Sequence, residues 1–164
     1  MSRSDSGSPA PSRTFPDAAD VTVSDAVSGD VLDFEAERDD ATTSWERADG
    51  LAALIERAST YGWLVTLPGG TDAHSVALAD ESGAFVGWCD CKGYEFNVGP
   101  CAHLCALRQA AYVHATTTDG ERVRIASTEV EDTPEVRPDG GHHIERACRE
   151  HATGGRRVGG EGSR

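Results

Sequence analysis

Four of the chain's five cysteines lie in the stretch CDCKGYEFNVGPCAHLC, which runs from Cys89 to Cys105 and contains one histidine. Thiols and an imidazole at this density suit a disulfide pair, a catalytic thiol or a metal site. The sequence shows no apolar signal peptide and no apolar run of about 18 residues for a membrane span, so we expect a cytoplasmic protein. Thiols stay reduced there, and an odd number of cysteines cannot all pair, so a metal site is favoured.

The spacing of the donors is Cys89-x-Cys91, nine residues, then Cys101-x-His103. A strand places residues i and i+2 on one face, so the first two sulfurs can aim at one point. Cys101 and His103 share a metal only if Cys101 precedes the first full helical turn, and Pro100 favours a helix start there. Three thiolates and a neutral imidazole match a tetrahedral zinc site without an open position. We expect such a structural zinc to supply on the order of 10 kcal/mol of folding free energy.

Other donors give alternatives to this set. Cys105 lies four residues after Cys101, so a continuous helix would put both on one face and offer a Cys₄ site in place of Cys₃His. A second tract of donors near the C-terminus comprises His142, His143, Cys148 and His151. No strand or apolar core surrounds that tract, and we expect it to be a loose tail that binds metal weakly when exposed.

The pattern of apolar residues predicts the elements that hold the donors. Thr43 and Glu46 fit a capping box, and an apolar stripe at helical spacing follows them, so we expect a helix that ends near residues 59–60. The stripe consists of Ala48, Leu51, Leu54, Ile55 and Ala58. Strands are predicted at 61–67, 75–79 and 84–88, followed by a closing helix after Pro100. Residues 123–125 suggest an added edge strand.

The expected fold class is therefore α+β: a small zinc-stapled sheet of three strands plus a helix, with a preceding helix and disordered tails. We assign 1–42 to a disordered acidic tail, 43–116 to the zinc-finger domain and 117–164 to a polar, mostly disordered tail. Short apolar alternations at 21–23 and 31–34 indicate either a transient strand or docking segment, or plain linker. The net charge of −13 and the single lysine resemble the composition of halophilic proteins that work in concentrated salt.

The motif as a whole resembles the SWIM zinc finger: Cys-x-Cys, a loop and Cys-x-His, preceded by an apolar hairpin and followed by Leu-x-x-Leu, over about residues 63–113. That family occurs in chromatin remodellers, transposases, kinases, recombination accessory proteins and many small archaeal proteins. The resemblance implies zinc at Cys89, Cys91, Cys101 and His103, a ββα core, and DNA or protein contact without catalysis. Ala102 stands where many members carry lysine.

Charge decides which kind of partner is favoured. Residues 45–116 hold 4 basic and 8 acidic residues, without an evident basic stripe. We therefore expect a non-catalytic protein-interaction module, accessory to a DNA transaction, and no enzyme. Direct nucleic-acid binding is the alternative, and a redox-responsive zinc site is a third. The candidate binding surface consists of Tyr94, Phe96, Lys92 and Arg108, where the two aromatic rings could stack on bases.

Overall fold

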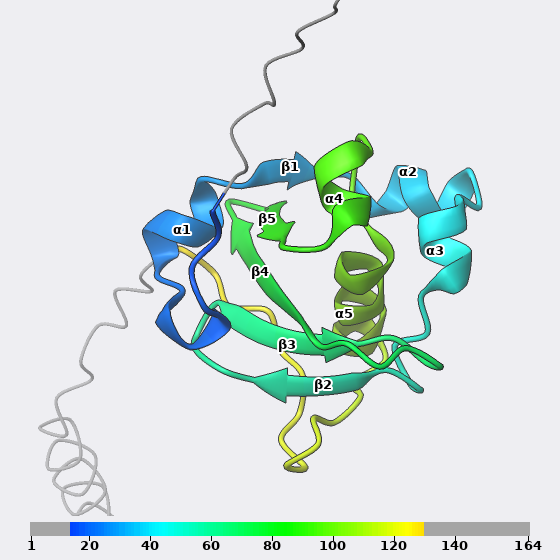
Figure 1. Cartoon of the computed structure of the whole chain (residues 1–164). Coiled ribbons are helices and arrows are strands. Elements are labelled where there is room, and N and C mark those ends of the chain that lie inside the picture. The colour runs from blue at the N-terminus through cyan, green and yellow to red at the C-terminus, as the bar shows by residue number, and fades with distance from the viewer. Residues whose placement is uncertain (1–13, 130–164) are drawn as a thin grey trace, which may run out of the picture. The chain divides into compact units, whose positions relative to one another are not determined.

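The computed structural model describes residues 14–129 of the chain (Figure 1). In chain order the elements are a 3₁₀ turn η1 (Ala18–Asp20), α1 (Val23–Val27), β1 (Asp30–Leu32), α2 (Phe34–Asp39), α3 (Thr43–Arg47), β2 (Leu54–Arg57), β3 (Gly62–Thr66), β4 (His74–Glu81), β5 (Ala84–Cys89), α4 (Lys92–Phe96) and α5 (Ala102–Tyr112).

The strands form one antiparallel sheet of five strands in the order β1-β5-β4-β3-β2. Consecutive hairpins join β3, β4 and β5 at its centre. The register pairs Trp63 with Val76 and Val76 with Cys89, so these three side chains share one face of the sheet. Ala77 and Trp88 are paired on the opposite face. The end of β5 therefore presents a sulfur to one face and a tryptophan to the other.

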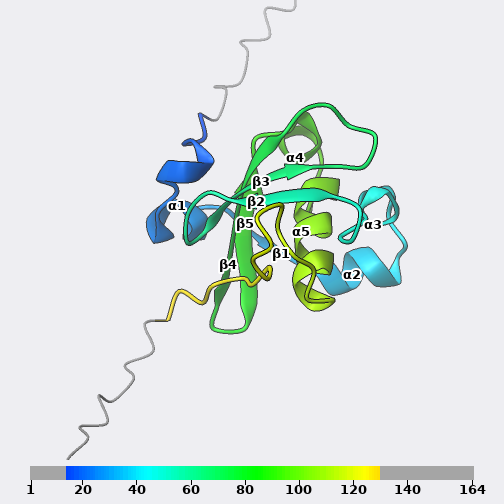
Figure 2. The same ribbon diagram turned by 90° about the horizontal axis from the view of Figure 1, so that it is seen from below.

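Helices cover both faces of this sheet. Residues 76–79 of β4 are all fully buried, which requires a layer of structure on each side of the strand. α5 contacts β3, β4 and β5, whereas α1 and η1 contact the sheet from the other side, as Figure 2 shows. On that second side, the ring of Phe15 stacks on Trp88 at 4.5 Å, and the Trp88 indole donates a hydrogen bond to the Asp25 carbonyl at 3.0 Å.

The N-terminal segment corrects the expectation of a disordered tail over 1–42. From residue 14 onward it folds, because the apolar face around Trp88 needs a cover and Ala18 and Ala26 are fully buried against it. Its acidic and hydroxyl side chains serve as helix caps, as at Asp17 and Thr22, rather than as free charge. The apolar alternation at 31–34 includes β1, an edge strand paired with β5. Residues 1–13 lie outside the described part of the chain.

The helix predicted from Thr43 to about residues 59–60 is also corrected. α3 ends at Arg47, and its cap is Thr42, whose hydroxyl accepts from the Trp45 amide at 3.2 Å. Gly50 packs so closely on α5 that a Cβ there would lie 2.3 Å from the Ala110 nitrogen. The residues that follow form β2 instead of a helix, because pairing with β3 buries Ile55 against the core. The rest of the apolar stripe does not share a buried face, since Leu51 and Leu54 are exposed.

The remaining elements follow the expectation more closely. β3, β4, β5 and α5 lie where the pattern predicted three strands and a closing helix. Residues 123–125 form no regular strand, although Val123 is fully buried and Asp80 pairs with the backbone of Ala126 and Thr128 at 3.0 and 2.9 Å. The predicted disordered tail from 117 is therefore wrong up to residue 129. The tract from His142 to His151 lies outside the described residues.

The fold class is α+β as expected, but with five strands in place of three and ordered flanks on both sides of the predicted domain. Among residues 14–129, no helix has the length and apolar character needed to cross a membrane.

Candidate metal centre

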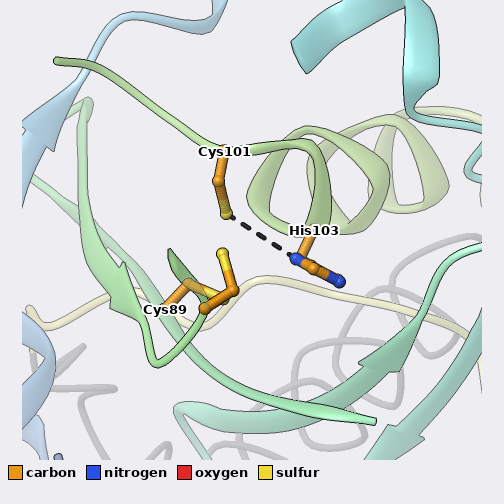
Figure 3. A group of neighbouring side chains, drawn as sticks. Cys89, Cys101 and His103 are labelled. Atoms are coloured by element: carbon orange, nitrogen blue, oxygen red, sulfur yellow. Dashed lines mark hydrogen bonds between the residues drawn. The ribbon is translucent and has the colours of Figure 1, made fainter. Parts of the chain in front are cut away.

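Cys89, Cys91, Cys101 and His103 converge on one point between the end of β5 and the start of α5. One donor atom from each of the four side chains lies within 4.8 Å of all the others. Figure 3 shows Cys89, Cys101 and His103 pointing toward one another, with the Cys101 sulfur 4.0 Å from the His103 Nδ1. A tetrahedral zinc with bonds of about 2.3 Å to sulfur has sulfur–sulfur edges of about 3.8 Å. The observed cluster is close to that spacing and fits zinc.

Each donor is positioned by a different element of local structure. Cys89 is the last residue of β5, and Cys91 caps α4, where its sulfur accepts from the Tyr94 amide at 3.4 Å. Cys101 is the residue before α5 and makes no side-chain capping bond, so its sulfur is available to a metal. The predicted break before the first full turn is thus confirmed. It lets Cys101 and His103 face the same point despite the helix that follows.

Burial and hydrogen bonds among the three thiols shift their pKa values in different directions. Burial raises the pKa of Cys89 well above its ordinary value, and the neighbouring thiols of Cys101 and Cys91 add to the rise. The pKa of Cys91 lies far below its ordinary value, because Cys101 and then Cys89 hydrogen-bond to its sulfur. Cys89 acts to lower the pKa of Cys101, but Cys91 and burial outweigh it and raise that pKa to about 12. Cys89 and Cys101 therefore hold their protons more tightly than an ordinary cysteine, and zinc must displace these protons when it binds.

Cys105 does not join the cluster, so the alternative Cys₄ set is wrong. α5 begins at Ala102, which places Cys105 a full turn inside the helix, where its side chain is fully buried in the core. Burial raises the pKa of this thiol well above its ordinary value. Cys105 is therefore a small core residue, and the imidazole of His103 takes the fourth position.

The candidate binding surface of four residues is not one surface. Tyr94 is buried, and its hydroxyl donates to the Asp30 carboxylate at 2.5 Å and lies 3.2 Å from the Gly87 carbonyl, so its ring is not free to stack on a base. Phe96 and Lys92 are exposed in the loop between the metal donors. Arg108 lies two turns further along α5, away from that loop.

Sequence reasoning missed a second histidine beside the metal centre. The ring of His74, at the start of β4, lies 4.4 Å from the ring of His103, centroid to centroid, and its Nδ1 is 2.8 Å from the Asp90 carboxylate. The register of β4 and β5 creates this contact, because the amide of Asp90 also donates to the Ser75 carbonyl at 3.1 Å. The His74 ring, itself bonded to Asp90, therefore packs against the His103 ring and limits its orientation.

The fold and the cluster define a zinc-binding finger of α+β class whose donors are all supplied by the chain. Residues 74–112 match the family model of the SWIM zinc finger, and this part of the chain is a SWIM zinc finger. Its Cys₃His cluster fits zinc as cofactor. The match covers the hairpin of β4 and β5, all four donors and α5. No curated protein and no solved structure matches the chain.

Proposed function

We propose that this protein is a non-catalytic interaction module in which zinc fixes the loop between Cys91 and Cys101, and that loop contacts a protein partner. We call residues 92–100 the zinc loop. The observation that carries the proposal is the exposure of two large apolar side chains there: Phe96 is 76% exposed and Val98 fully exposed. Large apolar side chains that are exposed next to each other on an ordered loop are typical of surfaces that contact another protein.

A groove beside the zinc loop supports this reading. It encloses about 520 Å³ between α3 and the start of α5, and it opens onto the metal site, since Cys91, Cys101 and His103 are among its lining residues. Apolar lining comes from Leu67, Val98 and Ala102, and the polar lining includes Thr42 and Arg47. Apolar groups next to polar ones are the usual make-up of a surface that contacts another protein.

The closed metal site supports a structural role for zinc. Cys89, Cys91, Cys101 and His103 would supply all four ligands of a tetrahedral zinc, so the metal would hold the fold together rather than carry out a reaction. Because the loop is fastened at both ends by donors, it loses little conformational entropy when a partner binds. Acidic residues outnumber basic ones around the centre, as at Glu37 and Glu95, and this favours a protein over a phosphate backbone at this face. An accessory role in a DNA transaction is consistent with such a module.

The test compares two double variants of the full chain that add the same charge. Phe96→Asp/Val98→Asp alters the zinc loop, whereas Val31→Asp/Leu51→Asp alters two other apolar residues that are about three-quarters exposed. Both should keep one zinc per chain and an unchanged melting temperature. Cross-linking mass spectrometry in nuclease-treated native cytosol at molar KCl identifies proteins joined to the wild-type chain, and calorimetry with the purified partner then measures affinity.

We expect the loop variant to lose at least about tenfold in affinity, as for residues that dominate interfaces, and the control to lose less than twofold. Equal affinity of both variants would contradict the proposal, as would a partner that remains bound only through nucleic acid.

A further inference from the structure

The few basic residues of the described chain are unevenly placed. Residues 14–129 carry 7 Lys and Arg against 20 Asp and Glu. Three of those seven, Arg108, Arg122 and Arg124, line one cavity of about 430 Å³ together with His114. We call this cavity the basic pocket. Its only acidic lining residue is Asp80, whose carboxylate accepts from the Gly83 amide at 2.8 Å.

The chain builds the basic pocket by turning back at the end of α5. His114 adopts a left-handed conformation, with φ of 56°, and the Ala115 amide donates to the Ala110 carbonyl at 2.8 Å, which closes the helix. The returning strand-like segment is anchored by Val123, which is fully buried and donates its amide to the Ala115 carbonyl at 2.9 Å. Because neighbours of a buried residue in extended chain point outward, Arg122 and Arg124 are both exposed.

The arginines of the basic pocket lack acidic partners in the described part of the chain. Ion pairs there join Arg38 to Asp39, Arg57 to Glu121 and His74 to Asp90, and none includes an arginine of the pocket. In a chain this acidic, leaving three guanidinium groups unpaired in one place concentrates positive potential at that place.

Aromatic rings adjoin these charges. The guanidinium of Arg108 lies 4.7 Å from the centre of the Phe85 ring and 5.7 Å from that of Tyr112. Tyr112 is 75% exposed, so one face of its ring is open to a flat ligand. Arginines that fit phosphate oxygens, next to an exposed aromatic ring, are the groups that bind single-stranded nucleic acid. An acidic peptide would use the arginines but would have no use for the ring.

We propose that the basic pocket binds the phosphate backbone of a single-stranded nucleic acid, and that Tyr112 stacks on a neighbouring base. The pocket lies toward the end of α5 opposite the metal donors, and the whole helix is about 16 Å long at a rise of 1.5 Å per residue. This activity goes beyond the proposed protein contact at the zinc loop and uses a different surface.

The test uses the zinc-loaded full chain and a fluorescein-labelled oligo(dT) of 15 nucleotides, with binding measured by anisotropy between 0.2 and 2 M KCl. Circular dichroism at each salt concentration checks that the protein is folded. Three phosphate contacts predict a slope of log affinity against log salt of about −2. The variant Arg122→Gln/Arg124→Gln should bind at least tenfold more weakly at the lowest salt and flatten the slope by about 1.4.

Matched variants separate the parts of the proposal. Arg47→Gln/Lys92→Gln removes the same charge from exposed positions near the zinc loop and should leave the slope unchanged. Tyr112→Ala should weaken binding about fivefold or more, and Tyr112→Phe should restore it, since stacking needs only the ring. The Phe96→Asp/Val98→Asp variant should bind the oligonucleotide normally, so failure of the protein-contact proposal is seen separately.

Three results would overturn the inference. One is the absence of oligonucleotide binding by the wild-type chain at every salt concentration. The second is an equal loss of affinity in the pocket variant and the control variant. The third is displacement of the oligonucleotide by poly-glutamate at the same charge concentration, which would assign the pocket to acidic peptides.

Discussion

Replacing Cys101 with alanine should remove zinc and unfold the part of the protein built around it. Cys101 is one of four donors, is almost fully buried and is otherwise unused, because its sulfur makes no capping bond to α5. Structural zinc contributes on the order of 10 kcal/mol in isolated fingers. The 116 residues from 14 to 129 would have about 6–17 kcal/mol of total stability at ordinary values per residue. Losing the metal therefore removes a large part of the total free energy of unfolding.

The loss of folded structure should begin around the metal donors and reach the rest of the sheet less strongly. α4 and the first turn of α5 fold around the donors, whereas the other face of the sheet is covered by α1 and η1 without them. Hydrogen exchange followed by mass spectrometry, in concentrated KCl, should show deprotection of residues 89–103 in the variant, and smaller changes in β2 and β3. Metal analysis should give less than 0.1 zinc per chain, compared with about one in the wild type.

Cys105→Ala is the matched control, because it removes an equally buried sulfur one turn further along α5. It should keep its zinc and its exchange protection, at a cost of about 1 kcal/mol for the small cavity. Loss of zinc from Cys105→Ala with retention in Cys101→Ala would refute the assignment of donors. Full protection of residues 89–103 in zinc-free protein would refute the structural role of the metal.

Three further outcomes follow from the structure. Two thiols of the metal-free cluster have raised pKa values and are protonated at neutral pH, so zinc binding releases two protons. Zinc affinity should therefore rise about 100-fold per pH unit between pH 7 and 8 and fall as the pH is lowered. Competition with a chelator measures this affinity, and a pH-independent affinity would contradict the prediction. His74→Ala should weaken zinc binding by no more than about tenfold, by the same competition, because the His103 ring loses the ring packed against it but no hydrogen bond, while the stability of the zinc-saturated form changes little. Gly87→Ala should lower the melting temperature by at least about 4 °C, since the added Cβ would lie 2.1 Å from the Ala77 carbonyl oxygen in β4; an unchanged melting curve would show that the strands can separate at no cost.

Local patterns in the sequence were enough to predict the centre of the molecule. The short apolar runs of β4 and β5, the proline before α5 and the kinds and spacing of the donors each act over fewer than about 20 residues, so they can be read along the chain. The same reasoning failed at 48–58, where the residues have helical spacing but form a turn followed by the strand β2. Pairing with β3 outweighed the weak intrinsic preference for helix there.

Sequence alone determined that this protein gathers three thiols and an imidazole for zinc, on a hairpin followed by a helix. Only the tertiary structure decided that residues 14–27 cover the second face of the sheet, that His74 lies against His103, and that three scattered arginines share one pocket. Those arrangements join segments separated by tens of residues. They follow from the burial of both faces of β4, which no stretch of sequence taken by itself can reveal.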